Sequence, residues 1–150
     1  MRTLAESCLK TAFTVLLLSA ATFACQPCQS TLNLEQSAAK AELIIVGKRL
    51  DFSPKEVEPQ SIRVRALRAL KGKAELKEIV VRSWHQMCPY GIIVGNQTYV
   101  MFLSRSAEMP GMYEAVEGGC GVKTLLVQNN LVLVEGKKMT LVALRKKYKL

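Results

Sequence analysis

The clearest strand signal in this chain of 150 residues is the stretch Thr98-Tyr99-Val100-Met101-Phe102-Leu103. Its β-branched, aromatic and large apolar side chains favour extended structure. The pair Gly95-Asn96, which is typical of turns, comes shortly before it. A short uncharged run that follows a turn signal predicts a strand buried in a core.

Similar short runs lie on both sides of this strand, with turn signals about every 8–15 residues. Residues 43–47 (Leu-Ile-Ile-Val-Gly) predict a buried strand, and residues 62–66 alternate apolar side chains with arginines, as in a half-buried strand. Lys71-Gly72-Lys73 predicts a turn. Further strands are predicted at residues 79–81, 113–116 and 131–134.

Two short helices are predicted at the flanks. Residues 33–41 contain Ala and Glu and precede the first strand, and Thr140 is suited to cap a helix that starts at Leu141. The basic run 145–149 would end this helix, where the helix dipole favours positive charge. Because no long helical crossover separates the strands, a doubly wound parallel sheet is disfavoured. We therefore expect a mainly β domain, a closed or partly open barrel of about five or six strands.

Residues 1–24 are typical of a secretory signal peptide. Arg2 and Lys10 supply positive charge, residues 11–23 form a short apolar run, and small residues such as Ala24 surround its end. The run is too short for a comfortable membrane span, and no later stretch reaches about 18 apolar residues. We expect a periplasmic or secreted protein, with a mature domain over residues 25–150 and no transmembrane segment in it.

The position of the cut stays open. Cleavage after Ala24 would make Cys25 the first mature residue, whereas cleavage after Ala21 would leave a short extension before it. Attachment of a lipid to Cys25 is a third alternative, because Ala24-Cys25 ends the apolar leader. That reaction would consume the Cys25 sulfur and leave an odd number of thiols.

The chain is basic, with 21 Lys and Arg residues against 12 Asp and Glu residues. This balance suits an acidic partner, a polyanion or simply solubility. Nucleic acid is disfavoured as a partner, because export separates the chain from it and no aromatic residues interleave with basic ones.

Four cysteines remain after removal of the leader: Cys25, Cys28, Cys88 and Cys120. In an exported domain such a set indicates disulfide bonds, and the sequence leaves all three pairings open. Long-range pairing would stabilise a small barrel most, because each closed loop removes about 4 kcal/mol of chain entropy from the unfolded state in the loop-entropy model.

Two other chemistries compete for these thiols. The Cys25-x-x-Cys28 spacing is similar to that of a redox site, although such a site usually follows a strand and opens a helix. A structural zinc is the second alternative, with Cys25, Cys28, His85 and Cys88 as a tetrahedral set. The single histidine and the absence of nucleophile or metallopeptidase motifs argue against catalysis. We expect a non-enzymatic domain without a cofactor.

The order of these features resembles the netrin-like module, known from the tissue inhibitors of metalloproteinases and from complement C-terminal domains. The resemblance covers residues 25–120, most of the mature chain. It is carried by the two early cysteines, the first strand at 41–48, residues 64–70 followed by Lys71-Gly72, Cys88 with Gly91, residues 99–103, and Cys120-Gly121.

The resemblance implies a five-stranded OB-fold barrel with short flanking helices and a disulfide-linked N-terminus. The family's disulfide scheme, carried over, pairs Cys25 with Cys88 and Cys28 with Cys120. One difference is that Gln26 and Pro27 separate the first two cysteines here, where the inhibitor pattern has one residue.

The resemblance to the inhibitor branch also implies a function. There, the α-amino group and carbonyl of the first cysteine chelate the catalytic zinc of a metalloprotease, a role that falls to Cys25. Gln26 would point toward the specificity pocket, and Gln86 and Met87 would fill neighbouring subsites. The alternative is a general module that binds an extracellular or envelope protein, or a polyanion, without inhibitory activity.

Overall fold

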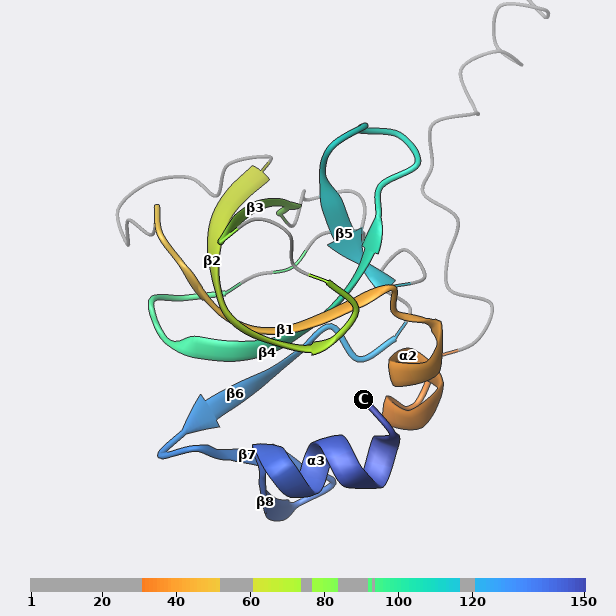
Figure 1. Cartoon of the computed structure of the whole chain (residues 1–150), viewed down its shortest axis with the longest axis vertical. Helices are drawn as coiled ribbons and strands as arrows, with labels where there is room; N and C mark the ends of the chain where they lie inside the picture. The colour runs from red at the N-terminus through yellow and green to blue at the C-terminus, as the bar shows by residue number, and fades with distance from the viewer. Residues whose placement is uncertain (1–30, 52–60, 74–76, 84–91, 93, 117–120) are drawn as a thin grey trace, which may run out of the picture.

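The described part of the chain is mainly β and is built around a closed five-stranded barrel (Figure 1). In the computed structural model it comprises residues 31–51, 61–73, 77–83, 92, 94–116 and 121–150.

The barrel closes because its first and fourth strands pair with each other. Its members are β1 (Leu43–Arg49), β2 (Ser61–Lys71), β3 (Glu78–Arg82), β4 (Thr98–Arg105) and β5 (Tyr113–Ala115). They lie in the order β1-β2-β3-β5-β4, and β4 returns to β1. All pairs are antiparallel except β3 with β5. A five-stranded barrel with this arrangement is an OB-fold, which confirms the predicted fold class.

Strand β1 is buried on both faces. Leu43 and Ile45 belong to the core inside the barrel, while Ile44 and Val46 belong to a second core outside it. Successive side chains of a strand point to opposite faces, so an uninterrupted apolar run serves both cores. This double burial explains why the run 43–47 shows no alternation of polar and apolar residues.

Strand β2 changes the face that it buries partway along its length. Its pairing with β1 shifts between Ile44 and Ile45 and again between Val46 and Gly47, so that Leu70 and Leu67 are extra residues on β2. Before the shifts Val64 lies in the barrel interior; after them Leu70 lies in the outer core. Leu67 is left 56% exposed. A bulge inserts such an unpaired residue and bends the strand.

A C-terminal meander extends the sheet beyond the barrel. Strand β6 (Thr124–Gln128) pairs with β4 beside β5, and β7 (Leu131–Val134) and β8 (Lys137–Thr140) follow it. Two-residue turns connect the three strands, and both residues of each turn have positive φ: Asn129 and Asn130, then Glu135 and Gly136. This is the backbone geometry of type I′ hairpin turns.

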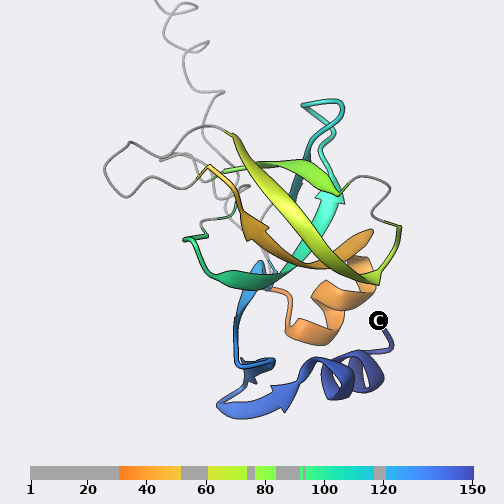
Figure 2. The same ribbon diagram turned by 60° about the vertical axis from the view of Figure 1, so that its left-hand side comes forward.

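Two helices cover the outer core. Figure 2 shows α2 (Leu34–Lys40) and α3 (Leu141–Tyr148) on the same side of the barrel as the meander. Leu34 of α2, Leu144 of α3 and Val132 of β7 are buried in this core together with Phe102 of β4. The outer core therefore joins the helices and the meander to the barrel.

The predicted helices are confirmed, including the cap of the second one. Asn33 and Gln36 form a capping box at the start of α2. The Ala143 amide donates to the Thr140 hydroxyl at 3.1 Å, and the last turn of α3 contains Arg145, Lys146 and Lys147. The predicted strands are also present. Strands β6 and β8 are additional, so the described part of the chain forms a sheet of eight strands rather than five or six.

We expect Leu144→Ala to lower the free energy of unfolding by about 2–4 kcal/mol, because it leaves a cavity in the outer core where Leu144 is 0% exposed. The matched control is Val142→Ala on the same helix, where the side chain is 69% exposed, and there the change should stay within about 0.5 kcal/mol. Urea unfolding measures both. Equal effects would show that α3 does not anchor to the barrel through Leu144.

Candidate functional site

The predicted N-terminal binding edge and all four mature cysteines lie outside the described residues. This applies to Cys25, Gln26 and Cys28, to Gln86, Met87 and Cys88, and to Cys120. Their pairing and roles therefore stay predictions. The described residues that flank them form the candidate site, because they fix where each of these segments joins the barrel.

The first flanking element is α2, which is attached to the barrel at its C-terminal end. The Lys71 ammonium group, on β2, donates to the carbonyl oxygens of Ala38 and Ala39 at 2.8 Å each. The last carbonyls of a helix have no partner within it, and a cation also suits the negative end of the helix dipole. Lys71 thus satisfies two such carbonyls from another element.

The buried face of α2 carries a hydroxyl group that binds the strand-5-to-strand-6 connection. Ser37 is 0% exposed; its hydroxyl donates to the Asn33 carbonyl at 2.8 Å and accepts from the Val122 amide at 2.8 Å. A buried hydroxyl is costly unless it is hydrogen-bonded. Ser37 therefore fixes the described chain after Cys120 against α2.

Gly121 is where the two flanking segments touch. A Cβ atom at this position would lie 2.5 Å from the Ser37 hydroxyl oxygen and 3.4 Å from the Leu32 Cβ. A side chain at 121 would collide with α2, so glycine permits this close approach. Gly121, directly after Cys120, and Leu32, four residues after Cys28, consequently lie close together.

The segment that contains Cys88 leaves and rejoins the barrel at adjacent points. Ser83 and Ile92 form a parallel bridge, and the Ile92 amide donates to the Arg82 carbonyl at 3.1 Å. Ile92 is 0% exposed and lies in the barrel core. These contacts hold both ends of the segment at the end of β3.

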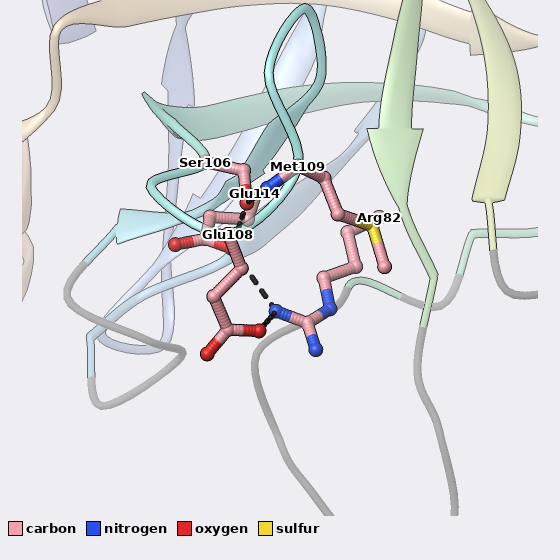
Figure 3. Close-up of polar contacts among 5 residues, drawn as sticks. All are labelled: Arg82, Ser106, Glu108, Met109 and Glu114. Carbon is pink, nitrogen blue, oxygen red and sulfur yellow. Dashed lines mark hydrogen bonds and ion pairs between the residues drawn. The ribbon is translucent and has the colours of Figure 1, made fainter.

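An ionic cluster braces the β4–β5 connection against the same end of β3 (Figure 3). The Arg82 guanidinium lies 2.9 Å from the Glu108 carboxylate and 3.4 Å from that of Glu114. The Ser106 hydroxyl donates to Glu114 at 2.9 Å and accepts from the Met109 amide at 3.2 Å. Arg82 and Glu114 have side chains that are each 17% exposed, so their interaction is screened less than a surface pair.

A second ionic group lies at the end of β1. The side chain of Arg49 is 3% exposed; its Nε lies 3.0 Å from Asp51, and its Nη1 donates to the Val94 carbonyl at 3.3 Å. Asp51 also accepts from the Arg63 amide at 3.0 Å. Partial burial alone would raise the pKa of Asp51, but the Arg63 amide and the Arg49 guanidinium outweigh it, and the net pKa is lowered. This group connects β1, β2 and the chain before β4.

Within the described residues, no group of three His, Cys, Asp or Glu residues is arranged to hold a metal ion. The predicted zinc set of Cys25, Cys28, His85 and Cys88 falls outside these residues and stays an alternative. No helix in the described part of the chain is long and apolar enough to span a membrane.

Sequence reasoning missed the residues that hold these segments. Lys71 was assigned only to a turn, although it ends β2 and caps α2. Ser37 did carry a signal: it lies three residues after Leu34 and one before Ala38, on the apolar face of the predicted helix. A hydroxyl on that face indicates a specific hydrogen bond. Nothing in the sequence pairs Arg82 with Glu108 and Glu114.

No family model and no curated protein matches this sequence.

We expect Lys71→Met to lower the free energy of unfolding by about 1–2 kcal/mol, because two helix carbonyls lose a charged donor. Amide exchange in α2 should accelerate more than exchange in β4. The control is Lys73→Met, an exposed lysine on the same turn, which should change neither quantity. Unchanged exchange in α2 of the Lys71 variant would refute the proposed attachment.

Asp51→Asn should lower the free energy of unfolding by about 1 kcal/mol at pH 7, because it removes the charge beside buried Arg49. The pKa of Asp51 is lower in the folded than in the unfolded chain, so its carboxylate stabilises the fold above the ordinary value of 3.8. That contribution is lost as the pH falls below 3.8 through the folded-state pKa.

Urea unfolding of wild type and Asp51→Asn between pH 7 and the acid limit measures this difference. Glu78→Gln is the control, because Glu78 pairs with Arg65 in solvent, with side chains 46% and 56% exposed. Its effect should stay below about 0.5 kcal/mol. If the difference in the free energy of unfolding between wild type and Asp51→Asn persisted undiminished at low pH, the Asp51 carboxylate would not be its cause.

Proposed function

We propose that this chain is an exported, non-enzymatic binding domain that presents its mature N-terminus as a binding edge. We further propose that the partner is a zinc metalloendopeptidase, with the α-amino group and carbonyl of Cys25 as ligands to its zinc. Gln26, Gln86 and Met87 would contact the pockets on either side. In this proposal residues 1–24 are removed as a signal peptide, and the protein is secreted or periplasmic.

The close approach of Leu32 to Gly121 is the observation that carries this proposal. Cys28 precedes Leu32 by four residues, and an extended stretch of this length spans at most about 14 Å. Cys120 directly precedes Gly121. A disulfide needs Cα atoms about 4.4–6.8 Å apart. The stretch from Cys28 to Leu32 is therefore long enough to let the Cα atom of Cys28 come within disulfide distance of the Cα atom of Cys120.

The other half of the proposed edge is supported by the contacts at the end of β3. Ser83 and Ile92 hold the two ends of the segment that contains Gln86, Met87 and Cys88. The Arg82 cluster braces the neighbouring β4–β5 connection. A rigid frame matters for function, because a ligand that is ordered before binding loses less entropy when it binds.

The chemistry of the proposed edge follows from the coordination of catalytic zinc. Such a zinc has three protein ligands and an open position that holds water. An uncharged amine and a carbonyl on one residue can displace that water together. A disulfide from Cys25 to Cys88 would hold the amine at a fixed place on the barrel, and Pro27 would restrict the short connection to Cys28.

The decisive experiment adds one alanine before Cys25 in the exported protein. Acylation of the Cys25 amine delocalises its lone pair into the new amide bond, so that the nitrogen no longer binds zinc. Inhibition of a susceptible zinc metalloendopeptidase should therefore weaken roughly 100-fold, about 2.7 kcal/mol. Hydrolysis of a quenched fluorescent peptide measures inhibition. Intact mass of the wild-type protein, reduced and unreduced, should give a chain that starts at Cys25 and contains two disulfides.

The control places the same alanine after Leu150, at the opposite end of the chain, where inhibition should be unchanged. Inhibition that survives the N-terminal alanine would contradict zinc chelation by the amine. Four free thiols, or a bound metal ion that holds them, would instead favour the redox or structural zinc alternatives.

A second candidate function is a general module that binds a protein or polyanion without inhibition. The uneven distribution of charge favours it: residues 121–150 contain seven Lys or Arg residues and a single acidic residue, Glu135. Binding through this region would be unaffected by the alanine before Cys25, and it would weaken as the salt concentration rises.

A further inference from the structure

Two exposed large apolar side chains, Leu67 (56% exposed) and Val142 (69%), lie at hollows that the β6–β7 turn helps to line. A third, Leu133 (60% exposed), lies on the face of β7 that points away from the outer core. Leu67 and Val142 line two hollows that share Arg68, Asn129, Asn130 and Leu141. Clustered exposed apolar groups beside a hollow are typical of a binding surface, whereas single ones need no explanation.

The two hollows form one groove between β2, the β6–β7 turn and the start of α3. Their volumes are about 450 and 340 Å³. Val46, Val127 and Leu141 give the first hollow an apolar lining, and the bulge of β2 directs Leu67 out of both cores and leaves it at this surface. The C-terminal meander forms the far wall of the groove through Val127, Asn129 and Asn130.

The groove is positively charged, because Arg68 is the charged residue among the described residues that line it and none of these is acidic. The side chain of Arg68 forms no ion pair or hydrogen bond with any described residue, unlike the side chains of Arg49, Arg65 and Arg82. One helical turn beyond Val142 lies Lys146, and residues three or four apart share a helix face. The side chains of Asn129 and Asn130 add amide donors and acceptors at the rim.

We propose that this groove binds an acidic peptide segment of a partner protein, with apolar side chains that alternate with carboxylates. The apolar side chains pack on Leu67, Leu141 and Val142, and the carboxylates pair with Arg68. This site is separate from the proposed N-terminal edge and does not depend on zinc chelation.

Charge and shape distinguish this occupant from the others. A second copy would bring the same basic groove against the first, and like charges across an interface disfavour association. A sulfated polysaccharide would leave the apolar lining without a partner. A flat membrane surface would need exposed apolar side chains that lie in one plane. Leu133 lies on the face of β7 opposite to Val132, which faces the outer core, so it does not extend the apolar surface of the groove.

The test uses a short fluorescent peptide in which glutamate and leucine alternate, with anisotropy as the readout at low ionic strength and the mature protein as titrant. We expect saturable binding, and a dissociation constant raised about tenfold by Arg68→Glu and by Leu67→Ser. A peptide that alternates lysine and leucine, and one that alternates glutamate and serine, should bind at least tenfold more weakly.

Two control variants match the chemistry of these changes. Arg63→Glu makes the same charge reversal on β2 outside the groove, and Leu133→Ser removes an equally exposed leucine on the other face of the meander. Both should leave the dissociation constant within about twofold of wild type.

Three outcomes would overturn the proposal. These are the absence of binding to the glutamate–leucine peptide, equal losses in the groove and control variants, and equal binding of the lysine–leucine peptide. Vesicles that contain phosphatidylglycerol and a sulfated polysaccharide serve as alternative probes. Arg68-dependent binding to either of these, stronger than binding to the peptide, would assign the groove to that ligand instead.

Discussion

The structure depends on the burial of β1 from both sides. Its two rows of side chains fill the barrel interior and the outer core, and its two edges pair with β2 and β4. Burial of each large aliphatic side chain contributes about 1.5–3 kcal/mol. Because one strand closes the barrel and also anchors the helices and the meander, a polar residue at Ile44 or Ile45 would disrupt one core and weaken the other.

Both proposed surfaces follow from this arrangement. The outer core holds α2 and α3 against the barrel, and Lys71 and Ser37 add polar contacts that orient α2. The start of α2 then lies beside Gly121, at the entry to the N-terminal segment. On the far side, the bulge in β2 leaves Leu67 and Arg68 facing the turn of the meander. The bent part of β2 therefore supplies Lys71, which caps α2, and also Leu67 and Arg68, which line the groove.

The sequence predicted the elements whose signal is local. The strand at 98–103, the first strand at 43–47 and the Thr140 cap are confirmed, because side-chain type and spacing decide them. Strand β6 was missed, although its residues Thr-Leu-Leu-Val-Gln stand directly before the turn pair Asn129-Asn130; in the structure it pairs with β4 and β7. Of the candidate sites, the sequence identified cysteines and their neighbours; it did not identify Lys71, Arg82 or the groove, which join residues distant in the chain.

Local sequence signals were enough to predict the class of fold, because runs of β-branched residues between turn signals leave few ways to bury their apolar faces. The basic charge and the candidate thiols are likewise evident from the sequence. The folded chain was needed to show which strand is buried twice, where β2 bends and which cation caps α2. These features depend on contacts between segments far apart in the chain, such as Lys71 with Ala38 and Gly121 with Leu32, and no local preference encodes such contacts.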